Sequence, residues 1–365
     1  MISLGKERCW AEVDRAALRH NARIARERIG PGMALLAVVK ANAYGHGMVE
    51  IAEALREEVE LFGVANLHEA IELRASGIAH PILILGPALP EERKAISEHG
   101  FIASISSFEE AKAFERSPGG INFAIDTGMG RMGCWHEEAI AELEKISRIP
   151  ELAVHSVSTH LPVADEDPAF TEEELVQFEE LVRRMRQRIG GGYKVHVLLS
   201  AGILGFARHR FDIVRAGLML YGSSPLPNEQ KHLQPVMALK SRVALLRDLP
   251  AGRSVSYGRT FATSRATRVA TISTGYADGY PRSTSNRDAS VLIGGKRCAL
   301  LGRVTMDLMM ADVTAVPNVA VGDEVVLIGK QGAEEILVAE VAERAGTIAW
   351  EIFTGIGSRV RRVYL

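Results

Sequence analysis

A single lysine closes the first long apolar stretch of this chain. Residues 33–39 are apolar throughout, Lys40 follows them directly, and residues 41–47 form a loop rich in small side chains. A lysine at the tip of a buried strand is well placed to be an uncharged amine at neutral pH, where it can form a Schiff base or carry a proton. A lysine that merely ends a strand would look the same, so the rest of the sequence must decide between the two.

Four more polar residues stand at comparable places further along the chain. Arg131, His160 and Ser200 each come shortly after an apolar stretch, and Arg215 lies within one. If these stretches are parallel strands of a barrel, their C-terminal ends lie on one face, and residues far apart in the sequence meet there. The pattern therefore predicts one pocket that holds Lys40 together with these four side chains.

The elements that must position these residues follow from an alternation of apolar and amphipathic segments. Short apolar or β-branched runs predict strands at residues 34–39, 61–65, 81–85, 101–105, 121–125, 153–158, 194–199 and 213–220. Charged helical patterns lie between most of them, for example at 90–99, 107–115, 137–149 and 171–189. Such alternation indicates βα units and a parallel sheet. Eight strands within roughly 200 residues favour a (β/α)8 TIM barrel over an open doubly wound sheet. No GxGxxG motif follows the first strand, which argues against dinucleotide binding.

The sequence pattern changes after about residue 235. Residues 236–247, 268–273, 289–301, 309–313 and 324–328 read as strands separated by Gly, Asp and Pro turns, with one late helix at 339–345. We therefore expect an α/β chain with a barrel at residues 14–235 and a β-rich C-terminal domain at 236–365. The segment Pro225-Leu226-Pro227-Asn228 has the composition of a linker.

Composition argues against several classes of function. The chain has 365 residues, and its formal net charge of −2 argues against a surface for nucleic acid or for an anionic membrane. No apolar run approaches the ~18 residues of a membrane span, and the N-terminus lacks the apolar core of a signal peptide. The three cysteines, Cys9, Cys134 and Cys298, are far apart and lack metal-ligand spacing. We therefore expect no metal site, and reduced thiols in a cytoplasmic protein.

Lys40 belongs to one of several short blocks that together resemble a known family. Lys40 with Tyr44-Gly45-His46-Gly47 resembles the cofactor-lysine segment of the alanine racemases, enzymes of fold type III that use pyridoxal phosphate. Further blocks with the same resemblance follow in the right order: Asp126-Thr127-Gly128-Met129-Gly130-Arg131, Ser158-Thr159-His160, Val214-Arg215-Ala216-Gly217 with Leu220-Tyr221-Gly222, Ser256-Tyr257-Gly258, Gly275-Tyr276-Ala277-Asp278-Gly279-Tyr280 and Gly302-Arg303-Val304-Thr305-Met306-Asp307. So many blocks in order, over essentially the whole chain, are a specific signal.

The resemblance implies a racemase that interconverts L-alanine and D-alanine with a pyridoxal phosphate cofactor. The cofactor is an electron sink for the charge left at Cα, so the protein need only orient it and place bases. By resemblance, Lys40 attaches the cofactor and is the base on one face of the substrate, and Tyr257 from the partner subunit is the base on the other. A tyrosine ordinarily has a pKa of about 10, so nearby cations must assist it. The resemblance thus implies a homodimer with active sites at its interface. It also implies that residues 1–13 pack on the C-terminal domain.

Further residues match the positions that bind cofactor and substrate in the family. For the cofactor these are Tyr44, Ser200 and the backbone amides of Gly217 and Leu218 at the phosphate, Arg215 facing the pyridine nitrogen, and His160 against the ring. A guanidinium at the pyridine nitrogen cannot accept a hydrogen and so limits delocalisation of charge into the ring. For the amino-acid substrate, Arg131 and the backbone N–H of the partner's Met306 match the carboxylate site. Tyr276 matches a tyrosine at the mouth that limits substrate size.

The chain departs from the family pattern at several positions expected around the pocket. Ala124 stands where the family often has a lysine that can be carbamylated, so Arg131 must be oriented by Asn122, by a bound anion, or not at all. Other departures are Leu199, Thr305, Trp350 and Ser358. These changes leave open a racemase of another small amino acid such as serine, or a catalytically impaired homologue that binds pyridoxal phosphate. A decarboxylase of similar architecture would need a carboxylate near the pyridine nitrogen, and Arg215 argues against it.

Overall fold

The computed structural model describes residues 7–365, and these fold into two compact units. One unit holds Leu18–Ala43 and Met48–Gln234. The other holds Pro235–Leu365, the chain up to Ala17, and the short stretch Tyr44–Gly47. Within residues 7–365, no helix is both long and apolar enough to cross a membrane.

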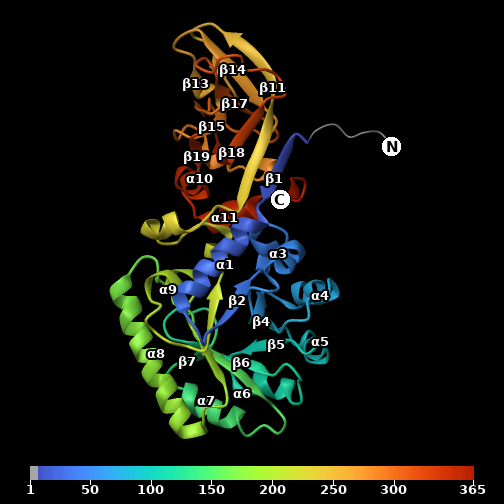
Figure 1. The fold of residues 1–365 in the computed structure, drawn as a ribbon, viewed down its shortest axis with the longest axis vertical. Coiled ribbons are helices and arrows are strands. Elements are labelled where there is room, and N and C mark those ends of the chain that lie inside the picture. Colours follow the sequence, from blue (N-terminus) through green and yellow to red (C-terminus); the bar gives the residue numbers. More distant parts are fainter. Residues whose placement is uncertain (1–6) are drawn as a thin grey trace. The chain divides into compact units, whose positions relative to one another are not determined.

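Eight parallel strands close into a barrel in the first unit (Figure 1). They are β2 (Ala34–Val38), β3 (Leu61–Val64), β4 (Ile82–Pro87), β5 (Ile102–Ile105), β6 (Ile121–Asp126), β8 (Val154–Ser158), β9 (Lys194–His196) and β10 (Ile213–Ala216). Each strand pairs with the next in this order, and β10 pairs with β2, which closes the ring. The short strand β7 (Cys134–Trp135) pairs with β6 outside the ring. The expected TIM barrel is thereby confirmed.

Helices surround the strands of this unit (Figure 1). They are α1 (Arg15–Ile29), α3 (Met48–Leu55), α4 (Leu67–Ala75), α5 (Arg93–Glu98), α6 (Phe108–Ala111) followed by η1 (Lys112–Phe114), α7 (Ala139–Ile146), α8 (Pro168–Ile189) and α9 (Ser200–Gly205). The longest, α8, begins well because Asp167 accepts a hydrogen bond from the Phe170 N–H and Pro168 occupies the first turn. Its buried side chains, among them Leu175, Phe178 and Val182, recur at helical spacing and form one face.

The second unit is built on a large mixed sheet. Its strands are β1 (Cys9–Val13), β11 (Met237–Leu249), β14 (Thr267–Ile272), β15 (Ser290–Ile293), β16 (Lys296–Ala299), β17 (Met309–Asp312), β18 (Glu324–Gln331), β19 (Glu334–Ile336) and β20 (Arg361–Tyr364), with a separate pair β12 (Ser254–Val255) and β13 (Phe261–Ala262). The N-terminal strand β1 pairs antiparallel with β11 and parallel with β20. Helices α10 (Val338–Ala345) and α11 (Ala349–Gly355) follow the last hairpin. The β-rich character expected of this part is confirmed.

Several elements end or divide where the apolar pattern does not. Strand β10 stops at Ala216 because Gly217 leaves the β region, with φ −121° and ψ −102°, and a 3-10 turn, η2 (Leu218–Tyr221), follows. The expected strand at 289–301 is a hairpin of β15 and β16. Gly294 and Gly295, with φ of 57° and 73°, form its two-residue turn, a conformation that glycine adopts without steric cost.

Candidate active site

Lys40 lies at the C-terminal end of β2, at the start of a short helical turn of unusual hand. This turn, α2 (Lys40–Tyr44), has φ of 53°, 53° and 52° at Ala41, Asn42 and Ala43, so it is left-handed. A left-handed backbone costs an L-residue roughly 1–2 kcal/mol, and consecutive non-glycine residues rarely adopt it. Contacts from elsewhere in the barrel must therefore hold the turn that carries the lysine.

Two side chains make these contacts. The Glu69 carboxylate accepts hydrogen bonds from the backbone N–H groups of Ala41 and Ala65, at 2.7 Å each. The Asn42 side-chain oxygen accepts a hydrogen bond of 2.8 Å from the Met48 N–H. These bonds pair the Ala41 N–H of the turn and tie the turn to Ala65 and Met48 outside it. Sequence reasoning assigned no role to Glu69, because its partner Ala41 lies 28 residues away along the chain.

A hydroxyl and two backbone amides converge at the start of α9. The Ser200 Oγ accepts hydrogen bonds from the N–H groups of Gly217 and Met219, at 3.0 and 3.3 Å. Such a group of donors suits a phosphate. That the amides of Gly217 and Leu218 contact this phosphate stays a prediction.

Arg215 is held on β10 with part of its guanidinium unsatisfied. Its Nη2 donates to the backbone carbonyls of Thr159 and Val197, the latter at 2.9 Å. Its Nε is buried and has no hydrogen-bond partner among residues 7–365. Burial, followed by the nearby Arg131 guanidinium, lowers the pKa of Arg215 to about 10. A buried donor of this kind fits a ligand acceptor such as the pyridine nitrogen of the expected cofactor.

Burial, and then repulsion among neighbouring basic groups, set the protonation states of the site. Burial, and next the Arg131 guanidinium, lower the pKa of Lys40, with Glu69 opposing them. Burial, Arg215, Arg131 and Lys40 together lower the pKa of His160 to about 3. His160 is therefore neutral at neutral pH, and Lys40 is shifted toward the free amine that nucleophilic attack or proton abstraction needs. The remaining positive charge favours anionic ligands.

The loop that presents Arg131 is shaped by a carboxylate at the end of β6. The Asp126 Oδ1 accepts hydrogen bonds from the N–H groups of Gly128 and Gly130, at 2.9 and 3.1 Å. Burial raises the pKa of Asp126, but these backbone hydrogen bonds outweigh it and hold the pKa below its usual value. The Arg131 side chain is exposed and makes no hydrogen bond or ion pair within the described part of the chain. It is thus free to bind a carboxylate.

Asn122 does not orient Arg131. Its side-chain nitrogen donates to the hydroxyls of Ser104 and Ser158, at 3.2 and 3.0 Å, and its oxygen accepts from Ser156 at 3.0 Å. These bonds join strands β5, β6 and β8 in a buried network and occupy both ends of the amide. The orientation of Arg131 must therefore come from another source.

The second unit carries the other predicted side chains. Tyr257, in the turn η4 (Tyr257–Arg259), is 70% exposed, and Met306 and Tyr276 are 54% and 40% exposed. Their exposure leaves all three side chains accessible on this unit. Tyr44 is buried, and burial raises its pKa to about 12. Tyr44 belongs to the second unit, whereas Ser200 lies in the first. The contact of Tyr44 with the phosphate therefore stays a prediction.

The loops that present Tyr276 and Met306 are tied together closely. The Ala277 N–H donates to the Met306 carbonyl at 3.0 Å. A Cβ at Gly275 would lie 2.2 Å from the Thr305 carbonyl oxygen, so only glycine permits this approach. The Met306 N–H itself donates no hydrogen bond within residues 7–365 and is available to a ligand.

Arg359 links the same two loops through ion pairs. Its Nε donates to Asp278 and its Nη2 to Asp307, at 2.7 Å each. Asp278 also accepts a hydrogen bond of 2.9 Å from the Gly275 N–H. Sequence reasoning assigned no role to Arg359. The pairing could not be found from the sequence, because its partners lie 52 and 81 residues away.

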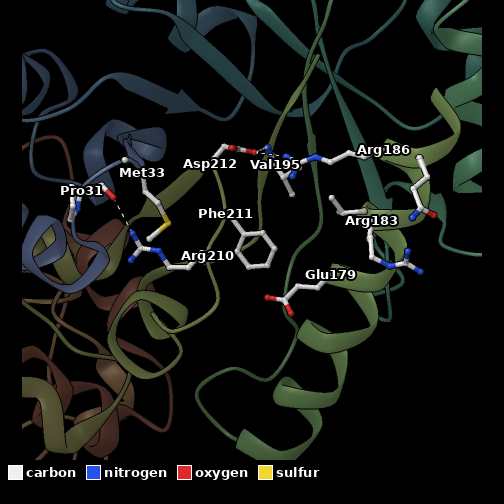
Figure 2. A pocket seen from close by; sticks show the side chains of 12 residues that line it. Pro31, Met33, Glu179, Arg183, Arg186, Val195, Arg210, Phe211 and Asp212 are labelled. Carbon is white, nitrogen blue, oxygen red and sulfur yellow. Dashed lines mark hydrogen bonds and ion pairs between the residues drawn. The ribbon is translucent and has the colours of Figure 1, made fainter. Parts of the chain in front are cut away.

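A cavity of about 680 Å³ lies at the opposite ends of the barrel strands (Figure 2). It is lined by residues just before β2 and β10, such as Met33 and Phe211, and by the C-terminal half of α8. Its charges are already paired: Arg186 with Asp212 at 3.0 Å, and Arg210 with the Pro31 carbonyl, also at 3.0 Å. Barrel enzymes place their chemistry at the C-terminal ends of the strands. This cavity is therefore not the candidate active site.

Comparison with known proteins gives a consistent result over the whole chain. Residues 13–225 match the family model "Alanine racemase, N-terminal domain", and residues 236–364 match "Alanine racemase, C-terminal domain". The alanine racemase of Methylacidiphilum infernorum is 43% identical, covering 98% of this chain and 92% of that protein. That of Carboxydothermus hydrogenoformans is 41% identical, covering 98% and 99%.

Solved structures agree. The alanine racemase from D-cycloserine-producing Streptomyces lavendulae superposes with a TM-score of 0.89 at 36% identity, covering 98% of this chain and 97% of that one. The Bacillus anthracis enzyme with bound L-Ala-P has a TM-score of 0.88 at 34% identity, covering 98% and 95%.

Proposed function

This chain belongs to the alanine racemase family, and on that premise we propose that it interconverts L-alanine and D-alanine with two bases, Lys40 and Tyr257 of a second copy. The observation that carries the proposal is the site on the barrel, where a lysine with a lowered pKa shares its electrostatic environment with Arg131, His160 and Arg215. The similar proteins described above are alanine racemases, which favours alanine over serine and an active enzyme over an impaired homologue.

The family uses pyridoxal phosphate, and the residues present fit that cofactor. When bound, the cofactor stabilises the negative charge that remains after the α-proton leaves. Lys40 would offer the amine for covalent attachment, and Ser200 with the amides of Gly217 and Leu218 would offer the phosphate site. Arg215 offers its unpartnered Nε to the pyridine nitrogen. We assign the face of the ring to His160, which is neutral at neutral pH and so adds no positive charge to that of Arg215.

Racemisation requires one proton carrier on each face of the substrate Cα. Lys40, freed by the incoming amine, removes or returns the proton on one face. We assign the other face to Tyr257, whose phenol is 70% exposed on its own chain. The basic site of a second copy would supply cations that help this phenol lose its proton. A homodimer with shared active sites follows from this assignment.

Substrate binding divides between the two copies in the same way. The guanidinium of Arg131 is free for the alanine carboxylate, with charge-assisted hydrogen bonds. The Met306 N–H of the partner subunit would add a further donor. Tyr276 of the partner subunit stands on the loop fixed by Arg359 and would limit the substrate side chain to a small one.

The chain's three free cysteines are all buried thiols, which supports a cytoplasmic location.

Incubation with L-alanine in heavy water tests the function. The protein, loaded with pyridoxal phosphate, should produce D-alanine and incorporate deuterium at Cα. Deuterium without D-alanine would show that one base works and that Tyr257 does not serve the second face. If neither product forms with alanine, the proposed reaction is wrong, and serine is the next substrate to assay.

A further inference from the structure

A buried glutamate on α8 reaches two loops of the active site through threonine hydroxyls. Glu174 is 4% exposed and lies on the buried face of α8. Its Oε1 accepts a hydrogen bond of 2.5 Å from the Thr127 hydroxyl, which is 2.7 Å from the Thr159 hydroxyl. Its Oε2 is buried and has no partner among residues 7–365. A carboxylate at such a place is costly, and nothing in the packing of α8 requires it.

The two threonines stand at the starts of loops that present active-site cations. Thr127 directly follows Asp126, whose carboxylate shapes the loop ending in Arg131. Thr159 directly precedes His160, and its backbone carbonyl accepts a hydrogen bond from Arg215. The Glu174 carboxylate therefore anchors the Thr127 hydroxyl, and the hydrogen bond between Thr127 and Thr159 joins the loop after β6 to the loop after β8. The two loops carry the groups assigned to substrate carboxylate and cofactor.

The hydrogen bonds of this chain of hydroxyls run in one direction. Thr127 gives its hydrogen to Glu174, so the bond between the threonines must use the hydrogen of Thr159. Without an acceptor at position 174, the Thr127 hydroxyl could turn toward Thr159, and the order of donors would no longer be fixed. Burial raises the pKa of the Glu174 carboxyl, opposed by the Thr127 hydrogen bond. Acceptance of a hydrogen bond, which does not require full ionisation, is thus the property at issue.

We propose that Glu174 is a positioning residue of the active site, which sets the places of Arg131 and Arg215 by accepting the hydrogen bond of the Thr127–Thr159 pair. This anchoring adds to the two hydrogen bonds by which Asp126 shapes the Arg131 loop. This inference rests on the proposed racemase function for its kinetic consequence but not for its effect on cofactor affinity.

The test compares variants that remove one partner of this hydrogen bond. Glu174→Leu removes the acceptor and Thr127→Val removes the donor, each with little change in shape, and Glu174→Gln keeps the acceptor. Glu173, the exposed neighbour on α8, provides the matched controls Glu173→Leu and Glu173→Gln. Three quantities are measured for each: KM and kcat for L-alanine, the affinity for pyridoxal phosphate by titration of cofactor-free protein, and the melting temperature.

The expected results separate positioning from structural support. Glu174→Leu and Thr127→Val should each raise KM and weaken cofactor affinity by about tenfold, the worth of roughly one hydrogen bond. Their double variant should be no worse than Thr127→Val, because that change alone already removes the hydrogen bond that Glu174 accepts. Glu174→Gln should restore both values. The melting temperature of Glu174→Leu should stay close to that of the wild type, because the change also removes an unpartnered buried oxygen.

Three outcomes would overturn the proposal. They are wild-type KM and cofactor affinity in Glu174→Leu, additive effects in the double variant, and failure of Glu174→Gln to restore function. A wild-type protein that does not racemise alanine would instead refute the proposed function, and the cofactor titrations would still decide the role of Glu174.

Discussion

The carboxylate of Glu69 accepts a hydrogen bond of 2.7 Å from the backbone N–H of Ala41, the residue that follows Lys40. Its other oxygen binds the Ala65 N–H at the end of β3, also at 2.7 Å. One side chain therefore anchors the left-handed turn of the lysine to the neighbouring strand. The placement of Lys40 depends on α4 as much as on its own strand.

We expect Glu69→Ala to destabilise the protein by about 1–3 kcal/mol, because it leaves two backbone donors without their acceptor. Activity should fall further than stability alone explains, since Lys40 loses its fixed position. Urea unfolding and kcat for alanine measure the two effects. Glu72→Ala, at an exposed position on the same helix, is the control. Loss of stability with unchanged kcat would show that the turn does not position Lys40.

Tyr257→Phe should abolish racemisation while leaving cofactor binding intact. Loss of one general acid–base group typically costs 10²–10⁴-fold in rate. Exchange of the α-proton with heavy water should continue for one enantiomer only, since Lys40 still serves its own face. Proton and deuterium NMR of both alanine enantiomers measures this. Tyr193→Phe removes a buried hydroxyl elsewhere on the barrel and should behave as wild type. Equal loss of exchange for both enantiomers would contradict the two-base assignment.

His160 should make stability depend on pH in the acidic range. Its pKa is about 3 in the folded protein and about 6.5 when unfolded, so only the unfolded chain takes up the proton between these values. The contribution of His160 to the free energy of unfolding is fully present above about pH 6.5. It declines as the pH falls toward 3, by up to about 1.4 kcal/mol per pH unit. Urea unfolding of cofactor-free protein at pH 5 and 7 should show this slope reduced in His160→Gln. The exposed His68→Gln is the control, and an equal slope in His160→Gln would refute the prediction.

Ser200→Ala should weaken binding of pyridoxal phosphate about tenfold, or about 1.4 kcal/mol, by removing a phosphate donor. Fluorescence titration measures the dissociation constant, and pyridoxal without its phosphate should bind both proteins equally. Ser147→Ala, at an exposed site, controls for the substitution. Unchanged affinity in Ser200→Ala would place the phosphate elsewhere.

Gly275→Ala should separate the loops of Tyr276 and Met306, since its Cβ would lie 2.2 Å from a backbone oxygen. We expect a rise in KM for alanine that exceeds any change in cofactor affinity, because these loops are assigned to the substrate. Gly192→Ala, where a Cβ meets nothing within 4 Å, is the control. A wild-type KM for alanine in Gly275→Ala, measured by steady-state kinetics, would show that neither loop belongs to the substrate site.

The fold class could be predicted because the apolar runs of the barrel repeat with amphipathic segments between them. Runs such as residues 34–39 and 121–125 are buried on both faces, and this pattern is local. The ends of strands were harder to predict. Val197, Leu198 and Leu199 are as apolar as the strand before them, yet β9 ends at His196. The chain turns there to bring Ser200 to the amides of Gly217 and Met219, a requirement that local apolarity does not encode.

The side chains that hold the site were the least predictable part. Lys40 stood out because a charged residue interrupts an apolar pattern, and Arg215 did so for the same reason. Glu69, Glu174 and Arg359 look like ordinary charges of helices or of a terminal segment. Their roles arise from contacts across many residues of sequence, which only the folded chain reveals.

The turn that follows Lys40 reverses the usual preference between alanine and glycine. In most helices the exchange of alanine for glycine weakens the fold by about 1 kcal/mol. At a left-handed position the steric penalty falls on alanine instead, at roughly 1–2 kcal/mol, which exceeds the entropic cost of glycine. Ala41 is exposed and has a φ of 53°. At this position glycine would adopt the backbone conformation at a lower cost in free energy than alanine. The protein keeps its reactive amine on a segment wound against the natural hand of its own amino acids.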